Sequence, residues 1–184
     1  MARRPTRAEV EAARGGRVAD VIATDLDVLF CGVNPSLYSA AVGHHFARPG
    51  NRFWPTLHLS GFTDRRLAPE EDRTLPDYDL GVTNLVARAT ASADELSKDE
   101  LVRGRRALRR KVARHRPAFV AVLGVVAYRQ AFARPRAQTG LQEEGLVDAR
   151  VWVLPNPSGL NAHYQLPELA ALFAALREAA RSSR

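Results

Sequence analysis

Two segments of this sequence place an asparagine, followed by a proline, just after an apolar run. Asn34 follows the run VLFCGV, and Asn156 follows the run VWVLP. An amide side chain offers both hydrogen-bond donors and an acceptor, which suits the edge of a nucleobase with its carbonyl and imino groups. Because ligands bind outside the carboxyl ends of the strands in an open α/β sheet, we expect both amides in one shared site.

Two further residues fit the same interpretation. Asn84 ends the segment LGVTN, whose alternation and β-branched residues predict a strand, and Phe46 belongs to an apolar and aromatic cluster that follows Asn34. The ring of Phe46 would stack on the face of a base. The alternatives are ordinary core packing for Phe46 and, for Asn34, an Asx turn that shapes the bend before Pro35.

The sequence lacks the motifs of several other kinds of binding and catalytic site. The glycine fingerprint of dinucleotide sites, the P-loop of phosphate sites and the G-x-S-x-G elbow of lipases are all absent. Cys31 is the one cysteine, and the five histidines do not have the spacing of a zinc enzyme. We therefore expect no cofactor and no metal.

The elements that position these residues follow from periodicity and capping signals. Strands are predicted at residues 27–32, 80–86, 119–123 and 151–154, and helices at residues 97–115, 125–132 and 166–176. Residues 133–148 are expected to form a loop or an edge hairpin. Strands that alternate with helices predict an α/β fold of three layers, with a central, mainly parallel four-stranded sheet flanked by helices on both faces.

Length and charge narrow the class of protein. The 184 residues fit a single domain over residues 1–184, and residues 1–20 read as a loosely ordered basic arm. A net charge of +7 and a pI of about 10.4 favour a polyanionic partner such as nucleic acid, although an arginine-rich solvated surface is the alternative. No apolar run has the length of a membrane span or of a signal peptide, so we expect a cytoplasmic protein without a membrane partner.

At this point the motifs carry a family resemblance. The segments are GVNP at residues 32–35, FARPGNRFW at 46–54, GVT at 81–83 and LPNPSGL at 154–160. In this order they resemble the mismatch-specific uracil/thymine DNA glycosylases of the uracil-DNA glycosylase superfamily, over about residues 28–176. The resemblance implies a bacterial-type monomer associated with the nucleoid. It would flip uracil from double-stranded DNA, notably from G·U mismatches, and hydrolyse the N-glycosidic bond without cutting the strand.

The resemblance also implies roles for individual residues. Asn34 would hold or polarise the hydrolytic water, and Phe46 would stack on the flipped uracil. The substrate pocket would include Gly32, Val33, Ser39 and Asn84, with Ser39 beside the C5 edge of uracil. DNA would be contacted by Asn156, Pro157, Ser158, Gly159, Leu160 and Asn161, with Leu160 filling the space left by the base and Gly159 facing the opposite guanine.

The sequence departs from the family pattern at three places. Ser36 stands where glycine is often found, Asn84 where lysine is frequent, and the second motif continues Asn161-Ala162-His163 where an arginine often helps to hold the orphaned base.

An amide cannot accept a full proton at neutral pH, so Asn34 orients water but does not deprotonate it. Either the reaction is highly dissociative or a carboxylate assists. Asp94 is the first candidate, with a helix-entry charge as its alternative interpretation.

Two other functions remain open at this stage. A non-catalytic, basic nucleic-acid-binding domain of the same fold would share the charge but would not need both Asn-Pro turns. An enzyme acting on free nucleosides or nucleotides would work without a duplex, and the absence of phosphate motifs makes it the weakest of the three.

Overall fold

The computed structural model describes residues 3–183 and contains a five-stranded sheet with the order β2-β1-β3-β5-β4. The strands are β1 (Val28–Gly32), β2 (Leu80–Asn84), β3 (Phe119–Leu123), β4 (Gly140–Leu141) and β5 (Arg150–Leu154). All neighbours pair in parallel except β4, which lies antiparallel to β5 at the edge. The predicted count of four strands is wrong by this edge strand, whose two residues are too few to carry a periodic pattern.

Helices connect the strands as the α/β prediction requires. They are α1 (Arg7–Ala12), α2 (Leu37–Val42), α3 (Phe53–Leu59), α4 (Lys98–His115), α5 (Val125–Ala131) and α6 (Leu166–Arg181), with the 3₁₀ segments η1 (Pro69–Tyr78) and η2 (Ala93–Glu95). The predicted capping box is confirmed at α4, where the Ser97 side chain accepts from the backbone of Glu100 and the Glu100 carboxylate accepts from the backbone of Ser97.

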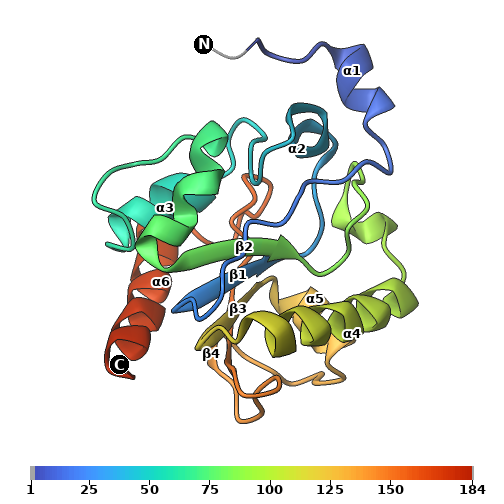
Figure 1. The fold of residues 1–184 in the computed structure, drawn as a ribbon. Helices are drawn as coiled ribbons and strands as arrows, with labels where there is room; N and C mark the ends of the chain where they lie inside the picture. Colours follow the sequence, from blue (N-terminus) through green and yellow to red (C-terminus); the bar gives the residue numbers. More distant parts are fainter. Residues whose placement is uncertain (1–2, 184) are drawn as a thin grey trace.

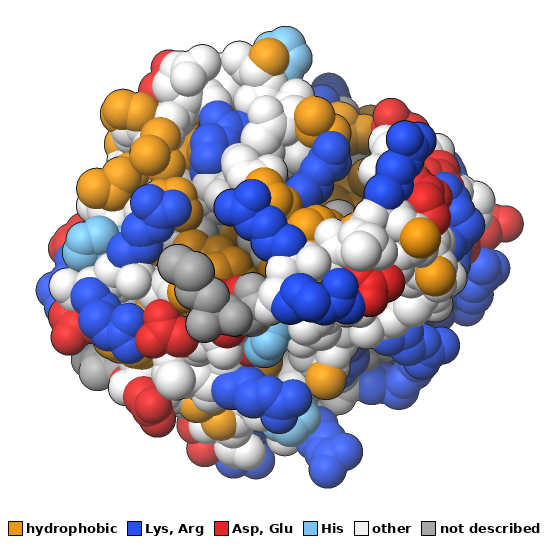
Figure 2. Space-filling model, turned by 90° about the horizontal axis from the view of Figure 1, so that it is seen from above, with side chains coloured by type: hydrophobic (Ala, Val, Ile, Leu, Met, Phe, Trp, Pro, Cys, Tyr) orange, Lys and Arg blue, Asp and Glu red, His pale blue; other side chains and the backbone are white. Residues whose placement is uncertain are grey.

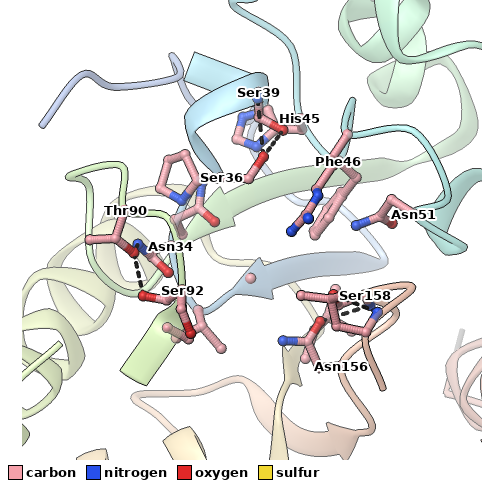
Figure 3. Close-up of a pocket in the computed structure, with 18 of the residues that line it drawn as sticks. Asn34, Ser36, Ser39, His45, Phe46, Asn51, Thr90, Ser92, Asn156 and Ser158 are labelled. Atoms are coloured by element: carbon pink, nitrogen blue, oxygen red, sulfur yellow. Dashed lines mark hydrogen bonds between the residues drawn. The ribbon is translucent and has the colours of Figure 1, made fainter. Parts of the chain in front are cut away.

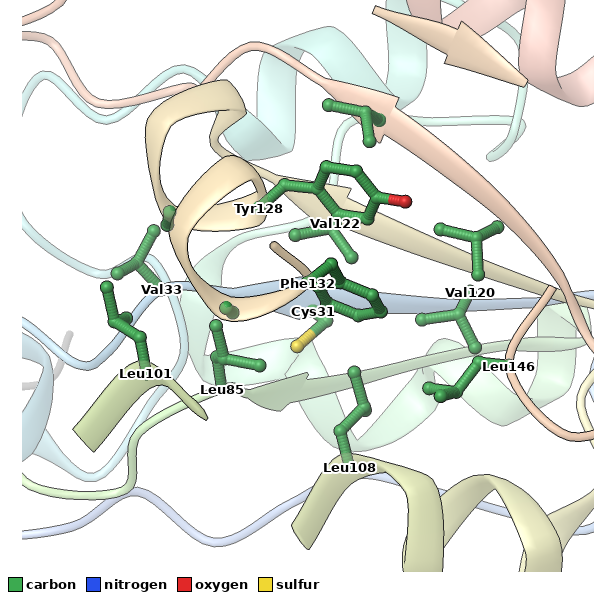
Figure 4. Close-up of a cluster of buried hydrophobic side chains, with 14 of the residues drawn as sticks. Cys31, Val33, Leu85, Leu101, Leu108, Val120, Val122, Tyr128, Phe132 and Leu146 are labelled. Atoms are coloured by element: carbon green, nitrogen blue, oxygen red, sulfur yellow. The ribbon is translucent and has the colours of Figure 1, made fainter. Parts of the chain in front are cut away.

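The two faces of the sheet are covered by different helix pairs (Figure 1), which confirms the three-layer prediction. Alternate residues of β1 point to opposite faces: Leu29 and Cys31 pack with α4 and α5, whereas Val28 and Phe30 pack with α3 and α6. Figure 4 shows the first of these two clusters, in which Tyr128 and the other labelled side chains surround Cys31. Burial raises the pKa of the Cys31 thiol to about 12, so this cysteine is an inert core residue.

The packing of α4 gives a first testable expectation. A Cβ added at Gly104 would lie 2.3 Å from the carbonyl oxygen of Leu85, which belongs to the loop after β2. We expect Gly104→Ala to lower the free energy of unfolding by about 1–3 kcal/mol, because overpacking outweighs the better helix propensity of alanine. Chemical denaturation measures this loss. Ala113→Ser, on the exposed face of α4, is the control and should change stability by no more than about 0.5 kcal/mol.

The segment before β1 runs beside the loop that follows β2. Thr6 and Glu9 form a capping box at α1, the Gly15 amide donates to the Ala89 carbonyl (3.0 Å), and Val21 bridges to Val82. Met1 and Ala2, which belong to the arm predicted over residues 1–20, lie outside the described residues. Within residues 3–183, no helix has both the length and the hydropathy needed to cross a membrane.

Candidate active site

A pocket of about 300 Å³ opens at the carboxyl ends of the parallel strands. It lies where β1 pairs with β2 on one side and with β3 on the other, which is the switch point of the sheet topology. The site residues predicted from the sequence that line it are Gly32, Val33, Asn34, Ser39, Phe46, Asn84, Asn156, Ser158, Leu160 and Asn161. Pro157 and Gly159 belong to the same loop as Leu160 but do not line the pocket.

The amide of Asn34 is held in one orientation. Its Nδ2 donates to the Arg88 carbonyl (3.0 Å) and to Thr90 Oγ1 (2.7 Å), and the Thr90 hydroxyl in turn donates to the Ser92 carbonyl (2.7 Å). A flipped amide would place its oxygen against the Arg88 carbonyl, which only accepts hydrogen bonds. Asn34 therefore keeps its Oδ1, an acceptor, free of described partners and available to the pocket (Figure 3).

The amide of Asn156 is held in the opposite sense. Its Oδ1 accepts a hydrogen bond from the Ser158 backbone amide (2.9 Å), while its Nδ2 donates to no described residue. In Figure 3 the nitrogen of Asn156 and the oxygen of Asn34 both face the space between the two residues. The pocket thus presents a fixed acceptor from one wall and a fixed donor from the other.

Backbone hydrogen bonds extend the pairing of β1 and β2 into the loops that carry Asn34 and Thr90. The Leu85 amide donates to the Gly32 carbonyl (2.8 Å), and the Val86 amide donates to the Val33 carbonyl (2.9 Å). Thr90 is fully buried, and its amide donates to the Pro35 carbonyl (3.2 Å). These bonds fix the two loops against each other before any ligand arrives.

Phe46 supplies an aromatic wall. One face of its ring stacks on Phe53, with centroids 4.2 Å apart, and the half-buried ring also lines the pocket. Gly32 leaves room for it, because a Cβ there would lie 3.2 Å from Phe46 Cζ and 2.7 Å from Asn84 Oδ1. The Asn84 side chain makes no hydrogen bond to any described residue, so its amide is available to a ligand.

Ser36 and Ser39 are joined in the first turn of α2. The Ser36 hydroxyl caps the helix by accepting from the Ser39 amide (3.1 Å), and it also donates to Ser39 Oγ (3.1 Å). Ser39 Oγ accepts a further hydrogen bond from the Ala47 amide (3.1 Å). The serine that replaces the family glycine at position 36 is therefore a helix cap, and the buried Ser39 presents a polar edge to the pocket.

The structure does not bring Asp94 to Asn34. Asp94 lies in η2 with an exposed side chain. It lines an adjoining cavity of about 860 Å³ beside α5 but not the Asn34 pocket, although the two cavities share lining residues such as Ala93 and Asn156. Gly124, which follows β3, also lines that second cavity, whereas Leu123 lines the Asn34 pocket. The described residues that line the Asn34 pocket include no carboxylate.

His45 forms a buried part of the pocket wall. Its Nε2 lies 2.9 Å from the Ala19 carbonyl, which only accepts, so the proton is on Nε2. Desolvation lowers the pKa of His45 below its ordinary value of 6.5, and the hydrogen bond to the Ala19 carbonyl and the nearby Asp72 oppose this shift only in part. His45 is therefore neutral at physiological pH.

This shift predicts a pH dependence of stability. Below pH 6.5 the unfolded chain binds a proton that the folded His45 does not, so the free energy of unfolding falls as the pH drops through that value. Chemical denaturation between about pH 7.5 and 5.5 should show a shallower fall for His45→Gln than for the wild type. Carboxylates such as Glu71 and Glu100, whose pKa is about 2, change the free energy of unfolding only at lower pH. If the free energy of unfolding fell equally steeply with pH in both proteins, the lowered pKa of His45 would be contradicted.

Charge around the site favours an anionic ligand. Lys and Arg side chains are spread over the face seen in Figure 2. The exposed Arg48 lines the pocket itself. Among residues 3–183, no group of three or more His, Cys, Asp or Glu side chains is placed to hold a metal ion.

Sequence reasoning missed several residues that shape the site. Thr90 and the Arg88 carbonyl, which orient Asn34, lie more than fifty positions away in the sequence, and no local signal connects them to it. Asn51 is a second case: it lines the pocket while its Oδ1 accepts from the Phe53 amide (2.9 Å). The FARPGNRFW segment contained Asn51 but gave no indication of this contact.

Comparison with known proteins adds to this geometry. The family model described as "Uracil DNA glycosylase superfamily" matches residues 19–180. Among solved structures, the chain is similar to the solution NMR structure of a "putative Uracil DNA glycosylase" from Methanosarcina acetivorans, with a TM-score of 0.57 and 19% sequence identity. The match covers 89% of this chain and 98% of that chain. At this identity the structural match shows a shared fold.

Proposed function

The chain belongs to the uracil DNA glycosylase superfamily, and from this membership we propose that it is a monofunctional glycosylase which removes uracil from mismatched double-stranded DNA. The enzyme hydrolyses the bond between C1′ of the sugar and N1 of the base. It leaves an abasic site in an uncut strand and acts as a monomer. The observation that carries this proposal is the pair of amides, Asn34 and Asn156, fixed in opposite orientations across one pocket.

The two amides suit the two halves of the reaction. As the C1′–N1 bond breaks, negative charge develops on the carbonyl oxygens of uracil, and the Nδ2 donor of Asn156 stabilises it. The Oδ1 acceptor of Asn34 holds a water molecule on the sugar side by accepting one of its hydrogens. Phe46 stacks on the base and keeps it between the two amides.

The pocket supports a dissociative reaction. No carboxylate among the described lining residues is present to take a proton from water, and the neutral amide of Asn34 does not take one. The base therefore leaves first as an anion. Water then forms the new bond to the cationic C1′, and the proton it releases passes to the departed uracil directly or through solvent. DNA phosphates, which lie near the sugar, stabilise its positive charge.

Leu160 supports the base-flipping part of the proposal. Its side chain is 72% exposed although it is large and apolar, and it lines the rim of the pocket that the base would enter. Filling the gap in the helix with this side chain recovers part of the unstacking cost, which is a few kcal/mol and is least at a mismatch. A G·U pair is accordingly the preferred substrate.

Ser39 supports a preference for uracil over thymine. A polar, buried hydroxyl at the pocket wall provides no apolar surface for the C5 methyl group of thymine. The substrate range is tested with labelled duplexes that contain a single G·U, A·U or G·T pair and with single-stranded uracil DNA. Alkali-sensitive breaks should form fastest at G·U and slowest at G·T. Comparable DNA binding without any alkali-sensitive product would favour the non-catalytic binding domain instead.

A further inference from the structure

Arg52, the residue directly before α3, holds the loop between β5 and α6 through backbone carbonyls. Its Nη2 donates to the carbonyls of Ser158 (2.7 Å) and Asn161 (2.8 Å), and its Nη1 donates to the carbonyl of Tyr164. The backbone amide of Arg52 also donates to the Pro157 carbonyl (2.9 Å). One residue thus contacts the loop at positions on both sides of Leu160.

The chemistry of these contacts requires a guanidinium. Three carbonyl oxygens converge on one planar group that carries five N–H donors in a fixed fork, and no single ammonium or amide matches that geometry. No described carboxylate forms an ion pair with Arg52. Its Nε is buried without a hydrogen-bond partner, which is unfavourable by itself. The side chain keeps this position because the loop carbonyls hold it there.

The loop has little else to fix its outer part. Leu160 is mostly exposed and packs on no core, and its amide makes one long hydrogen bond, to Ser158 Oγ (3.3 Å). Gly159 lies directly against Gly50, where an added Cβ would be 2.6 Å from the Gly50 carbonyl oxygen. The position of Leu160 is therefore determined by the backbone of the loop, and Arg52 is the main tertiary contact of that backbone.

We infer that Arg52 is a positioning residue that holds residues 157–164 of this loop in the shape in which Leu160 enters the DNA helix. This inference rests on the proposed function, because it takes Leu160 as the group that replaces the flipped base. A loop ordered before DNA arrives loses less conformational entropy when Leu160 is inserted. Arg52 contacts neither base nor sugar in this arrangement and acts only through the loop.

The test compares duplex with single-stranded substrate. Under single-turnover conditions, Arg52→Lys should slow uracil removal from a G·U duplex by about tenfold or more, the effect of losing a charge-assisted hydrogen bond. Single-stranded uracil DNA needs no wedge, so its rate should change by less than about twofold. Arg65→Lys, at an exposed arginine paired with Glu71, is the matched control and should leave both rates unchanged.

A double-mutant cycle identifies the route of the effect. If Arg52 acts through Leu160, adding Arg52→Lys to Leu160→Ala should not slow duplex cleavage further. Additive losses, or an equal loss on single-stranded DNA, would overturn the inference. Arg52→Gln serves as a second variant if Arg52→Lys does not fold, and it should show the same duplex-selective loss.

Amide hydrogen exchange provides a readout that does not depend on catalysis. Exchange within residues 157–164 should be faster in Arg52→Lys than in the wild type, while exchange in β1 and β3 stays unchanged. Unchanged exchange in the loop would overturn the positioning role. If the wild type removes no uracil from any substrate, the proposed function fails, and the exchange result still decides whether Arg52 orders the loop.

Discussion

Replacing Asn34 with alanine is expected to lower the single-turnover rate of uracil removal by about 100-fold or more, on duplex and single-stranded substrates alike. The substitution removes the one acceptor that Asn34 presents to the pocket, so the attacking water loses its fixed position. Affinity for uracil-containing DNA should change little, because the water is needed in the chemical step. Rates under enzyme excess and DNA affinity by fluorescence anisotropy measure the two quantities separately.

Two threonine variants sharpen this prediction. Thr90→Val keeps the Asn34 amide but removes one of the two hydrogen bonds that orient it. We expect this loss to raise the activation free energy of uracil removal by about 1 kcal/mol, which lowers the rate about fivefold. Thr56→Val is the matched control, because the Thr56 hydroxyl is buried without a hydrogen-bond partner and lies in α3. Thr56→Val should keep the activity of the wild type, and its stability should be equal to or higher than that of the wild type. A fully active Asn34→Ala would exclude the proposed role of the amide.

Replacing Leu160 with alanine is expected to separate duplex from single-stranded activity. Without the side chain, the gap left by the flipped base stays open, and removal of uracil from a G·U duplex should slow by about 10- to 100-fold. The rate on single-stranded uracil DNA should stay close to that of the wild type. Because Leu160 is mostly exposed, the thermal stability of the protein should not change.

The matched control for this variant is Leu59→Ala, which truncates a leucine that is 58% exposed on α3 and outside the pocket. It should leave both activities unchanged. If Leu160→Ala slowed uracil removal equally on duplex and single-stranded substrates, Leu160 would act on the pocket and not by filling the gap in the DNA helix.

The sheet and the amphipathic helices could be predicted because their signals are local. The apolar run of β3 and the capping box of α4 each lie within a few residues of the element they define. The edge hairpin expected within residues 133–148 is present, but β4 itself could not be predicted as a strand, since its two residues show no alternation and pair only with the later strand β5. β4 forms only through the pairing of Gly140 with Val153 and of Leu141 with Trp152, which lie 13 and 11 positions apart in the sequence.

The sequence predicts which residues form much of the site, but it does not predict how their side chains are oriented. Two amides after two strands indicated a shared pocket, yet the orientation of each amide depends on distant or backbone partners, such as Thr90 for Asn34. The place of Asp94 in the loop after β2 makes it a candidate for the assisting carboxylate, but in η2 its side chain lines the adjoining cavity beside α5. Arg52 belongs to the FARPGNRFW motif, but its three carbonyl partners come from a loop more than a hundred positions later in the sequence.

The most direct test of the central claim is the identity of the products. A duplex with a single G·U pair is incubated with the wild-type protein, and both fractions are analysed by mass spectrometry. We predict free uracil together with a strand of unchanged length that lacks one base, and much less of both with Asn34→Ala. An intact uracil-containing strand, or release of uracil still attached to its sugar, would contradict the proposal.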